Sequence, residues 1–249
     1  MLLSVNLNKI ALLRNSRGAN YPNLEEYALK ALKAGAEGIT LHPRPDHRHA
    51  TSKDVINLSK LVKDFGAEFN IEGNPFEKKV GEYIGFEELV FETNPTQATL
   101  VPDTLNQITS DHGWSSGSHD KDLKIIIKNL KNHTDRVSIF IDPSEKSIDY
   151  AIKMNVDSIE LYTEDYAKLF LSNKNKALTL LKDYKNLILL AKSHNLRVNA
   201  GHDLNLDNLA PLRALNLVDE VSIGHAIIID SLNFGFIDTI NRYIAITKG

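Results

Sequence analysis

Short apolar segments alternate with longer amphipathic stretches along the whole chain. The apolar segments have the length and composition of buried β-strands, and each is followed by a stretch long enough for a helix. Strands that alternate with helices pair in parallel through right-handed crossovers. Eight parallel strands close a (β/α)8 barrel, so we expect an α/β fold of the TIM-barrel type with extra helices. The eight predicted strands span residues 3–6, 38–41, 68–71, 98–101, 137–141, 158–161, 197–200 and 220–223.

Apolar residues at helical spacing mark several of the intervening helices. Asp142 and Pro143 predict the start of one of them, as N-cap and first-turn proline. Residues 76–94 have the pattern of two short helices broken near Gly85, and residues 163–195 have room for an extra helix before the one that precedes the seventh strand. The clearest apolar stripes are Leu24, Tyr27, Ala28, Ala31 and Leu32; Leu123, Ile126, Ile127 and Leu130; Ile148, Ala151, Ile152 and Val156; and Phe236, Ile237, Ile240 and Ile244.

Composition favours a single domain over residues 1–249. The length of 249 residues is typical of one barrel, and 42% apolar with 24% charged residues can fill a large core. A net charge of −3 gives no general attraction to nucleic acid or anionic membranes. The chain has no cysteine, which excludes thiol catalysis and fits a reducing cytoplasm. We expect no signal peptide and no membrane span, because no apolar run is long enough.

The loop after the second strand, from His42 to His49, carries the densest set of candidate residues. It holds three histidines and two arginines in eight residues and is stiffened by two prolines. Arginine binds phosphate in a planar, bidentate way, which makes this loop a candidate phosphate site. An ordinary solvated loop can have the same composition, but a place directly after a barrel strand favours function.

Two Gly-His pairs follow the seventh and eighth strands. Because parallel strands end on the same side of a barrel, Gly201-His202 and Gly224-His225 are expected to meet there. The backbone around Gly224, at the start of a helix, is a candidate phosphate cradle. His202, taken alone, is better explained as a core histidine whose two nitrogens are both bonded.

Glu72 and Lys9 also follow predicted strands, and each has two interpretations. A carboxylate desolvated in a barrel mouth has a raised pKa, which suits Glu72 to general-base catalysis. The alternative is a helix cap or an ion pair with an arginine. Lys9 could form a Schiff base if its pKa were depressed, or attract a substrate phosphate. With Arg14 and Arg17 close by in the sequence, we favour anion binding.

Several ordered motifs are similar to those of one known family. They are Val5 to Ala11 with Leu13 to Gly18; Gly38 to Arg44 with Asp46, Arg48 and His49; Asn70 to Glu72; Leu100 to Pro102 with Thr109 to Trp114; Val198 to His202; and Ile223 to Ile228. Together they resemble the pyridoxine 5'-phosphate synthase family, which closes the pyridoxine ring in the deoxyxylulose 5-phosphate-dependent route to vitamin B6. The similarity runs from the first strand to the last helix.

The resemblance implies a barrel enzyme assembled as an octamer. It implies condensation of 1-deoxy-D-xylulose 5-phosphate with 3-amino-2-oxopropyl phosphate to pyridoxine 5'-phosphate, phosphate and water. No metal and no organic cofactor is implied, and the partners are small phosphorylated substrates and other subunits, without nucleic acid or membrane. By position in the motifs, His42 and Glu72 are proton acceptors and His202 is a proton donor. The implied substrate-binding residues are Asn6, Asn8, Lys9, Arg17, Arg44, His49, Thr109, Asp203, Gly224 and His225.

Three places depart from the common family pattern. Asn8-Lys9 stands where many members have Asp-His, so the contact with deoxyxylulose phosphate made there must differ. Asp203 stands where glycine is usual, and its charge would repel a phosphate unless it faces away or pairs with Lys9 or an arginine. Residues 160–164, Glu-Leu-Tyr-Thr-Glu, replace a common His-Thr-Gly motif but include no residue that we assign to proton transfer.

Two other functions are compatible with the same residues. A metal-dependent hydrolase or aldolase on this fold could bind zinc through His42, His49, Glu72, His202 and His225. The arginines of the same loop oppose a dication, however. A non-catalytic relative could bind a phosphorylated ligand with the same loops, but the presence of every residue assigned to proton transfer favours an enzyme.

Overall fold

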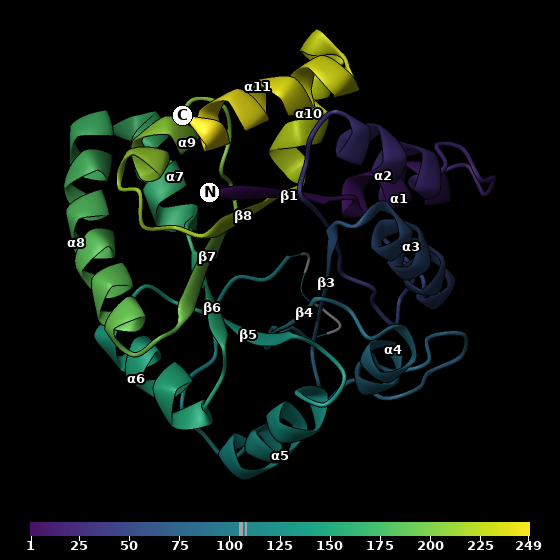
Figure 1. The fold of residues 1–249 in the computed structure, drawn as a ribbon, viewed down its shortest axis with the longest axis horizontal. Coiled ribbons are helices and arrows are strands. Elements are labelled where there is room, and N and C mark those ends of the chain that lie inside the picture. The colour runs from purple at the N-terminus through teal and green to yellow at the C-terminus, as the bar shows by residue number, and fades with distance from the viewer. Residues whose placement is uncertain (105–106, 108) are drawn as a thin grey trace.

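The computed structural model describes residues 1–104, 107 and 109–249. Its strands are β1 (Leu2–Asn6), β2 (Gly38–Leu41), β3 (Glu68–Gly73), β4 (Gln97–Leu100), β5 (Arg136–Ile141), β6 (Ser158–Tyr162), β7 (Arg197–Gly201) and β8 (Glu220–Ile223). They pair in parallel and in chain order, and β8 pairs with β1 to close the barrel (Figure 1). The predicted α/β barrel is confirmed, and every predicted strand end lies within two residues of the observed one.

Helices surround the barrel (Figure 1). They are α1 (Asn8–Asn15), α2 (Leu24–Lys33), α3 (Ser52–Phe65), α4 (Phe86–Thr93), α5 (Asp120–Leu130), α6 (Glu145–Met154), α7 (Glu164–Ser172), α8 (Lys174–Ser193), α9 (Leu209–Ala214), α10 (His225–Phe234) and α11 (Phe236–Lys248). The extra helices α1, α7 and α10 directly follow β1, β6 and β8, at the strand ends where barrel enzymes bind substrates. The predicted room for an extra helix in residues 163–195 is filled by α7 and α8. In the described ranges, no helix combines the length and apolarity that crossing a membrane requires.

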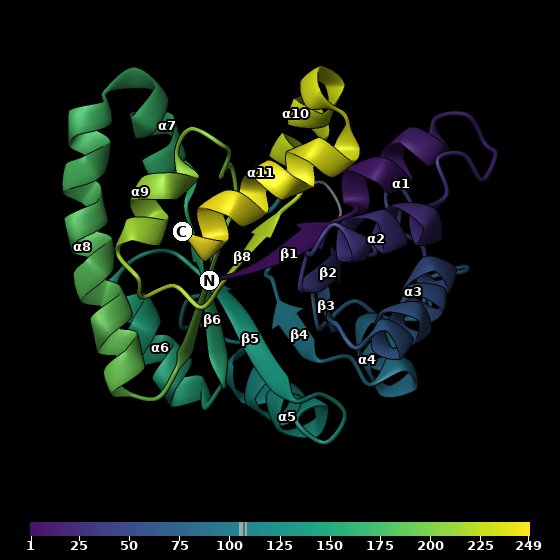
Figure 2. The same cartoon turned by 45° about the horizontal axis from the view of Figure 1, so that its top comes forward.

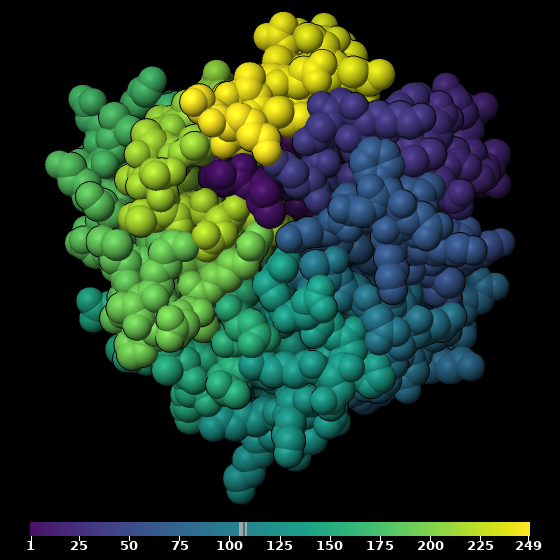
Figure 3. Space-filling model, in the orientation of Figure 1, coloured from purple at the N-terminus to yellow at the C-terminus, as the bar shows by residue number. Residues whose placement is uncertain are grey.

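Helix α11 completes the outer ring. It packs between α9 and α2, beside β1 (Figure 2), and buries Ile240 and Tyr243. Ile237, predicted on the buried stripe of this helix, is instead 52% exposed. The Nε of Arg213 in α9 donates a hydrogen bond to the Thr247 carbonyl oxygen (2.8 Å). The purple N-terminal and the yellow C-terminal segments lie next to each other on one face of the molecule (Figure 3).

The prediction of two helices in residues 76–94 is wrong for its first half. Residues 76–85 form a loop in which Val80 and Tyr83 pair as an isolated bridge, and α4 is the one helix in this stretch. Gly81 and Gly85 have left-handed φ angles of 57° and 104°, which interrupt a right-handed helix.

The predicted start of α6 at Asp142 and Pro143 is also wrong by two residues. The helix begins at Glu145, and the Ser144 side chain is its N-cap. The Asp142 carboxylate accepts a hydrogen bond from the Gly113 N–H (3.1 Å) instead of capping the helix. Asp142 has the chemistry of a helix cap, but its carboxylate is bonded to a distant part of the chain instead.

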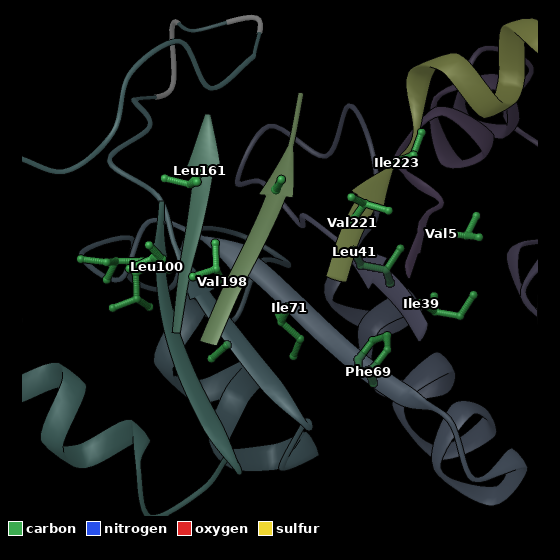
Figure 4. Close-up of a cluster of buried hydrophobic side chains, with 14 of the residues drawn as sticks. Val5, Ile39, Leu41, Phe69, Ile71, Leu100, Leu161, Val198, Val221 and Ile223 are labelled. Carbon is green, nitrogen blue, oxygen red and sulfur yellow. The ribbon is translucent and has the colours of Figure 1, made fainter. Parts of the chain in front are cut away.

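Most apolar side chains of the strands face outward and pack under the helices (Figure 4), whereas Phe140 and Tyr162 form a separate buried cluster with Val101. Val5, Ile39, Ile71, Val198 and Val221 are fully buried in this layer. Each such side chain contributes about 1.5–3 kcal/mol relative to exposure, so this layer is the main source of the barrel's stability.

The inside of the barrel is polar. Thr99 donates to Asn70 (2.9 Å), and the Asn70 amide reaches the Thr40 hydroxyl (3.5 Å). Gln97 donates to Thr99 and accepts from Asn199 on the other side of the barrel, both at 3.2 Å. Branched apolar side chains usually fill this space in TIM barrels. Here a hydrogen-bonded interior replaces them and can hold buried carboxyl groups close to the strand ends.

Candidate active site

A cavity of about 330 Å³ opens at the carboxyl ends of the strands. Apart from Arg17, every residue predicted to bind substrate or transfer protons lines it. The structure thus brings residues from β1, β2, β3, β7 and β8 and from the loop after β4 to one place, as barrel topology requires. Among the lining residues are Asn6, Asn8, Lys9, His42, Arg44, His49, Glu72, Thr109, Ser110, Glu160, Lys168, His202, Asp203, Ser222, Gly224 and His225.

Glu72 lies near the end of β3 and is only 8% exposed. Its Oε2 accepts a long hydrogen bond from the Asn6 amide (3.4 Å) and lies 3.7 Å from Nδ1 of His42. Its Oε1 accepts from the Ser222 hydroxyl (3.5 Å). Burial, reinforced by the negative charge of Asp103, raises the pKa of Glu72 to about 8. The carboxyl group can therefore gain or lose a proton near neutral pH.

Asn8 connects the first two strands. Its backbone N–H donates to the Asn6 side-chain oxygen (3.0 Å), and its own side-chain oxygen accepts from the His42 N–H (3.0 Å). Through Asn8, these bonds fix the backbone of His42 relative to the Asn6 side chain, whose amide contacts Glu72. The Asn8 amide oxygen is thus already used within the protein, although the residue lines the cavity.

Asp103 is a central residue of the site that sequence reasoning missed. It is 1% exposed and forms an ion pair with Arg44, while the Ser110 hydroxyl donates to the same carboxylate oxygen (2.8 Å). That oxygen also lies 3.7 Å from Nε2 of His42. Arg44, predicted as a phosphate ligand, therefore already carries a counter-charge. The signal available in the sequence was a carboxylate directly after the fourth strand.

Burial lowers the pKa of three histidines in the cavity. The pKa of His42 falls well below its ordinary value through burial and the nearby charge of Arg44. Burial and Arg48 lower that of His49 to about 4, and burial lowers that of His202 to about 4. All three rings are therefore neutral at neutral pH. Nδ1 of His49 and Nδ1 of His202 are buried without a hydrogen-bond partner among the described residues.

His202 occupies a strained turn at the end of β7. His202 and Asp203 have φ angles of 79° and 58°, in the left-handed region that side chains disfavour. The Thr163 hydroxyl lies 2.6 Å from the carbonyl oxygens of His202 and of the residue before it. The rings of Phe140 and Tyr162 flank the imidazole, with centroids 4.7 and 5.0 Å away. These contacts hold the ring of His202 at the cavity wall.

Asp203 lines the cavity near Glu164, Lys168 and His225. Partial burial and the Glu164 carboxylate raise its pKa, while His225 and Lys168 oppose this effect. Lys168 is paired with Glu164 (2.6 Å). In the described ranges, Asp203 makes no ion pair with Lys9 or with an arginine. The negative charge of Asp203 is therefore not neutralised by either of the partners that the sequence analysis named.

Gly224 is the N-cap position of α10, and His225 is the first residue of that helix. A Cβ at position 224 would lie 3.0 Å from both the Cβ and the carbonyl oxygen of Asn6. Glycine therefore allows α10 to start close against β1. No side chain of the described residues caps α10, so its first-turn N–H groups are free to bind an anion.

Glu160 is a second buried carboxylate of the cavity, to which the sequence reasoning gave no role. It is 3% exposed, and burial together with the charges of Glu72 and Glu220 raises its pKa well above the ordinary value. A Cβ at Gly201 would lie 2.3 Å from Oε1 of Glu160, so glycine makes room for this carboxyl group. The available signal was a carboxylate in the middle of β6, at an inward-facing position between apolar residues.

The cations of residues 9–17 are used in different ways. Lys9 lines the cavity. Arg14 is held by both carboxylate oxygens of Asp54 (2.5 and 2.8 Å), away from the cavity. Arg17 is exposed and also lies outside the cavity. A substrate contact of Arg17 therefore stays a prediction from the resemblance.

The geometry does not support the zinc alternative. Across residues 1–104, 107 and 109–249, no three His, Asp or Glu side chains are grouped so that they could hold one metal ion. The two ring nitrogens of His42 lie 3.7 Å from two different carboxylates, and one of these is already paired with Arg44.

Solved structures resemble this chain in fold alone. Thiamine phosphate pyrophosphorylase from Pyrococcus furiosus has a TM-score of 0.59 and 12% identity, covering 99% of this chain and 95% of its own. Tryptophan synthase from M. tuberculosis has a TM-score of 0.63 and 8% identity, covering 99% and 93%. Both likenesses agree with the barrel architecture and say nothing about the reaction.

Sequence comparison identifies the family. A pyridoxine 5'-phosphate synthase of Cytophaga hutchinsonii is 49% identical over 243 residues, which cover 97% of each chain. One of Xylella fastidiosa is 46% identical and covers 98% of this chain and 94% of its own. The family model described as Pyridoxal phosphate biosynthesis protein PdxJ matches residues 3–249. This chain therefore belongs to the family of the pyridoxal phosphate biosynthesis protein PdxJ.

Proposed function

We propose that this chain has pyridoxine 5'-phosphate synthase activity. It condenses 3-amino-2-oxopropyl phosphate with 1-deoxy-D-xylulose 5-phosphate and yields pyridoxine 5'-phosphate, phosphate and water. The observation that carries the proposal is the full-length similarity to synthases at 44–49% identity. The cavity supports it, because its residues suit two phosphorylated substrates. Residues 1–249 act as one catalytic domain in the cytoplasm, and the absence of cysteine is compatible with a reducing compartment.

Two anion-binding regions line the cavity. Lys9, Arg44, His49 and Thr109 form the first, which binds the phosphate of the deoxyxylulose substrate. The free N–H groups at the start of α10, after Gly224, form the second and bind the other phosphate. Each substrate is thus held by its phosphate, and the reacting carbons meet between them, near Glu72.

The reaction requires several proton transfers and no redox step. The amine condenses with a ketone, water and phosphate leave, and the ring closes and becomes aromatic. Glu72 accepts and returns protons, because its raised pKa lies near the working pH. His42 is neutral and lies 3.7 Å from Glu72, where it also accepts a proton. His202, at the carboxyl end of β7, is neutral in the free enzyme, so it first takes up a proton that the substrates release and then donates that proton to a leaving oxygen.

The pH dependence of kcat/KM follows from the state of Glu72. A general base must be ionised, so kcat/KM is expected to rise with pH through about 8 and then level off. His49 and His202, with pKa values of about 4, and His42, whose pKa burial holds well below its ordinary value, are neutral in the free enzyme throughout this range and add no further step. Initial rates measured from about pH 6 to 9 test this, after correction for the ionisation of the substrate phosphates, whose second pKa is about 6. A flat profile would contradict it.

The variant Lys9→Ala is expected to raise KM for deoxyxylulose phosphate by about ten- to hundredfold, the size of a charge-assisted hydrogen bond, with a smaller change in kcat. Lys128→Ala is the control, because Lys128 is an exposed lysine of α5 away from the cavity. Steady-state kinetics with each substrate varied in turn distinguish the two. Borohydride trapping of a substrate adduct on Lys9 would show a covalent role instead.

The direct test uses purified, chelator-treated protein and both phosphorylated substrates. Pyridoxine 5'-phosphate, followed by its absorbance and fluorescence, is the expected product. No product from folded protein that binds either substrate would favour the non-catalytic relative. Product that appears only after metal is restored would return the hydrolase or aldolase chemistry to consideration.

The resemblance also leads us to propose a homo-oligomer, an octamer. Leu12 and Leu13 on α1, and Ile229 and Leu232 on α10, are 39% to 80% exposed. The two helices contact each other, so these side chains lie on one region of the surface. Exposed apolar residues gathered in this way favour a protein interface. Sedimentation equilibrium should give the mass of eight chains, and a monomer would contradict the proposal.

A further inference from the structure

The side chain of Asn15 holds the loop that carries the candidate phosphate ligands. Asn15 ends α1, and its amide nitrogen lies 3.0, 3.2 and 2.8 Å from the carbonyl oxygens of His47, Arg48 and His49, so its two hydrogens are shared among three acceptors. Three successive carbonyl groups thus converge on one amide. His47 has a left-handed φ of 53°, a conformation that is costly for histidine and persists only when its surroundings hold it.

Arg14 decides which way the Asn15 amide faces. Its Nε donates to the Asn15 side-chain oxygen (3.0 Å), so the amide nitrogen must face the loop. Both terminal nitrogens of Arg14 donate to Asp54 (2.5 and 2.8 Å). Asp54 in turn accepts from the backbone N–H and the hydroxyl of Thr51, the N-cap of α3 (2.7 and 2.8 Å). A continuous set of hydrogen bonds therefore joins the start of α3 to the loop.

The His47 N–H donates to the Arg44 carbonyl oxygen (3.0 Å), so the hold on residues 47–49 extends to Arg44. We propose that Asn15 is a positioning residue, which sets His49 and Arg44 in the geometry that binds the phosphate of the deoxyxylulose substrate. This rests on the proposed function. Asn15 is not among the described residues that line the cavity, so it acts through the loop. His49 makes the shortest of the three bonds through its carbonyl, and its ring lines the cavity with a buried Nδ1 that has no partner among the described residues.

The variant Asn15→Asp separates the hydrogen-bond donor from the volume of the side chain. A carboxylate keeps the size and the contact with Arg14, but it turns an acceptor toward three carbonyl oxygens. Asn15→Ala removes the donor and the volume together. The matched control is Asn57→Ala, because the Asn57 amide joins α3 to Glu25 of α2 (3.1 Å) and does not touch the loop.

Both Asn15 variants are expected to raise KM for deoxyxylulose phosphate by about tenfold or more, because a shift of about 1 Å in a binding group has effects of this size. KM for 3-amino-2-oxopropyl phosphate should change by less than about twofold, and Asn15→Asp should be the more severe variant. Asn57→Ala should match the wild type. Wild-type kinetics in Asn15→Asp, or equal increases in KM for both substrates, would overturn the proposal.

Amide hydrogen exchange tests the same proposal without catalysis. Peptides that cover residues 42–50 should exchange faster in both Asn15 variants, and at the wild-type rate in Asn57→Ala. Unchanged exchange in this loop would overturn the role of Asn15. If the wild type makes no product but the variants still loosen the loop, the proposed function fails while the hold of Asn15 on the loop stands.

Discussion

Replacing Glu72 by glutamine is expected to lower kcat by about 10²- to 10⁴-fold, the range that a positioned general base contributes. Glutamine has the same size and can still accept the hydrogen bonds from Asn6 and Ser222, but it cannot take up a proton. KM for the two substrates should change little, because their phosphates are bound elsewhere in the cavity. Product formation in a single turnover measures the effect, and circular dichroism checks that the variant is folded.

Glu220→Gln is the matched control for this variant. Glu220 is also buried inside the barrel (3% exposed), where burial and the charge of Glu68 raise its pKa to about 7. It is bonded to Arg197 (3.1 Å) and lies outside the described lining of the cavity. We expect near-normal kcat, since an interior carboxylate is lost without loss of chemistry. Near-normal turnover in Glu72→Gln itself would remove Glu72 from the mechanism.

Gly113→Ala is expected to have the largest effect on stability, a loss of about 3 kcal/mol in the free energy of unfolding. A Cβ at this position would lie 2.3 Å from the Cα of Ile141 and 2.4 Å from the backbone nitrogen of Asp142. Both are main-chain atoms at the end of β5 and cannot turn aside as a side chain would. The neighbouring Trp114 is anchored by a hydrogen bond from its ring to the Leu100 carbonyl oxygen (2.9 Å). The segment therefore has little freedom to shift.

A thermal unfolding midpoint lower by about 6–12 °C would report this loss in a chain of this size. Gly117→Ala is the matched control, because the nearest atom to its added Cβ is 4.0 Å away. It should leave the midpoint almost unchanged, within about 0.5 kcal/mol. Equal midpoints for the two variants would show that the segment around residue 113 shifts to accommodate the added methyl group without loss of stability.

The barrel could be predicted because each strand segment carries apolar residues, which pack against the helices, and is followed by a polar loop. Val221 and Ile223, on either side of a serine in β8, illustrate this alternation. Which of two possible partners a polar side chain would bond could not be predicted. Asp142 has the chemistry of a helix cap, but its carboxylate bonds Gly113, 29 positions earlier, and Ser144 caps the helix instead. Local patterns identify what a residue is able to do, whereas packing decides which partner it meets.

The same distinction applies to the site. Residues at strand ends could be predicted one by one, because barrel topology gathers those ends. The groups that set their charge could not. Asp103 raises the pKa of Glu72 and pairs with Arg44, which is 59 positions away. Glu160 belongs to the cavity because Gly201, on the next strand, leaves space for its carboxyl group. Such pairings depend on three-dimensional register, which no single segment of the sequence contains.

Asn6 and Gly224 come together from opposite ends of the chain, where β8 pairs with β1. Contacts between residues so far apart in sequence are slow to form. A ribosome adds about 5–20 residues per second, so β1 waits roughly ten to forty seconds for the strand that covers its free edge. During that time the edge is open to pairing with other chains. The cavity is therefore incomplete in every nascent chain that ends before β8, and the first strand stays exposed until that strand is made.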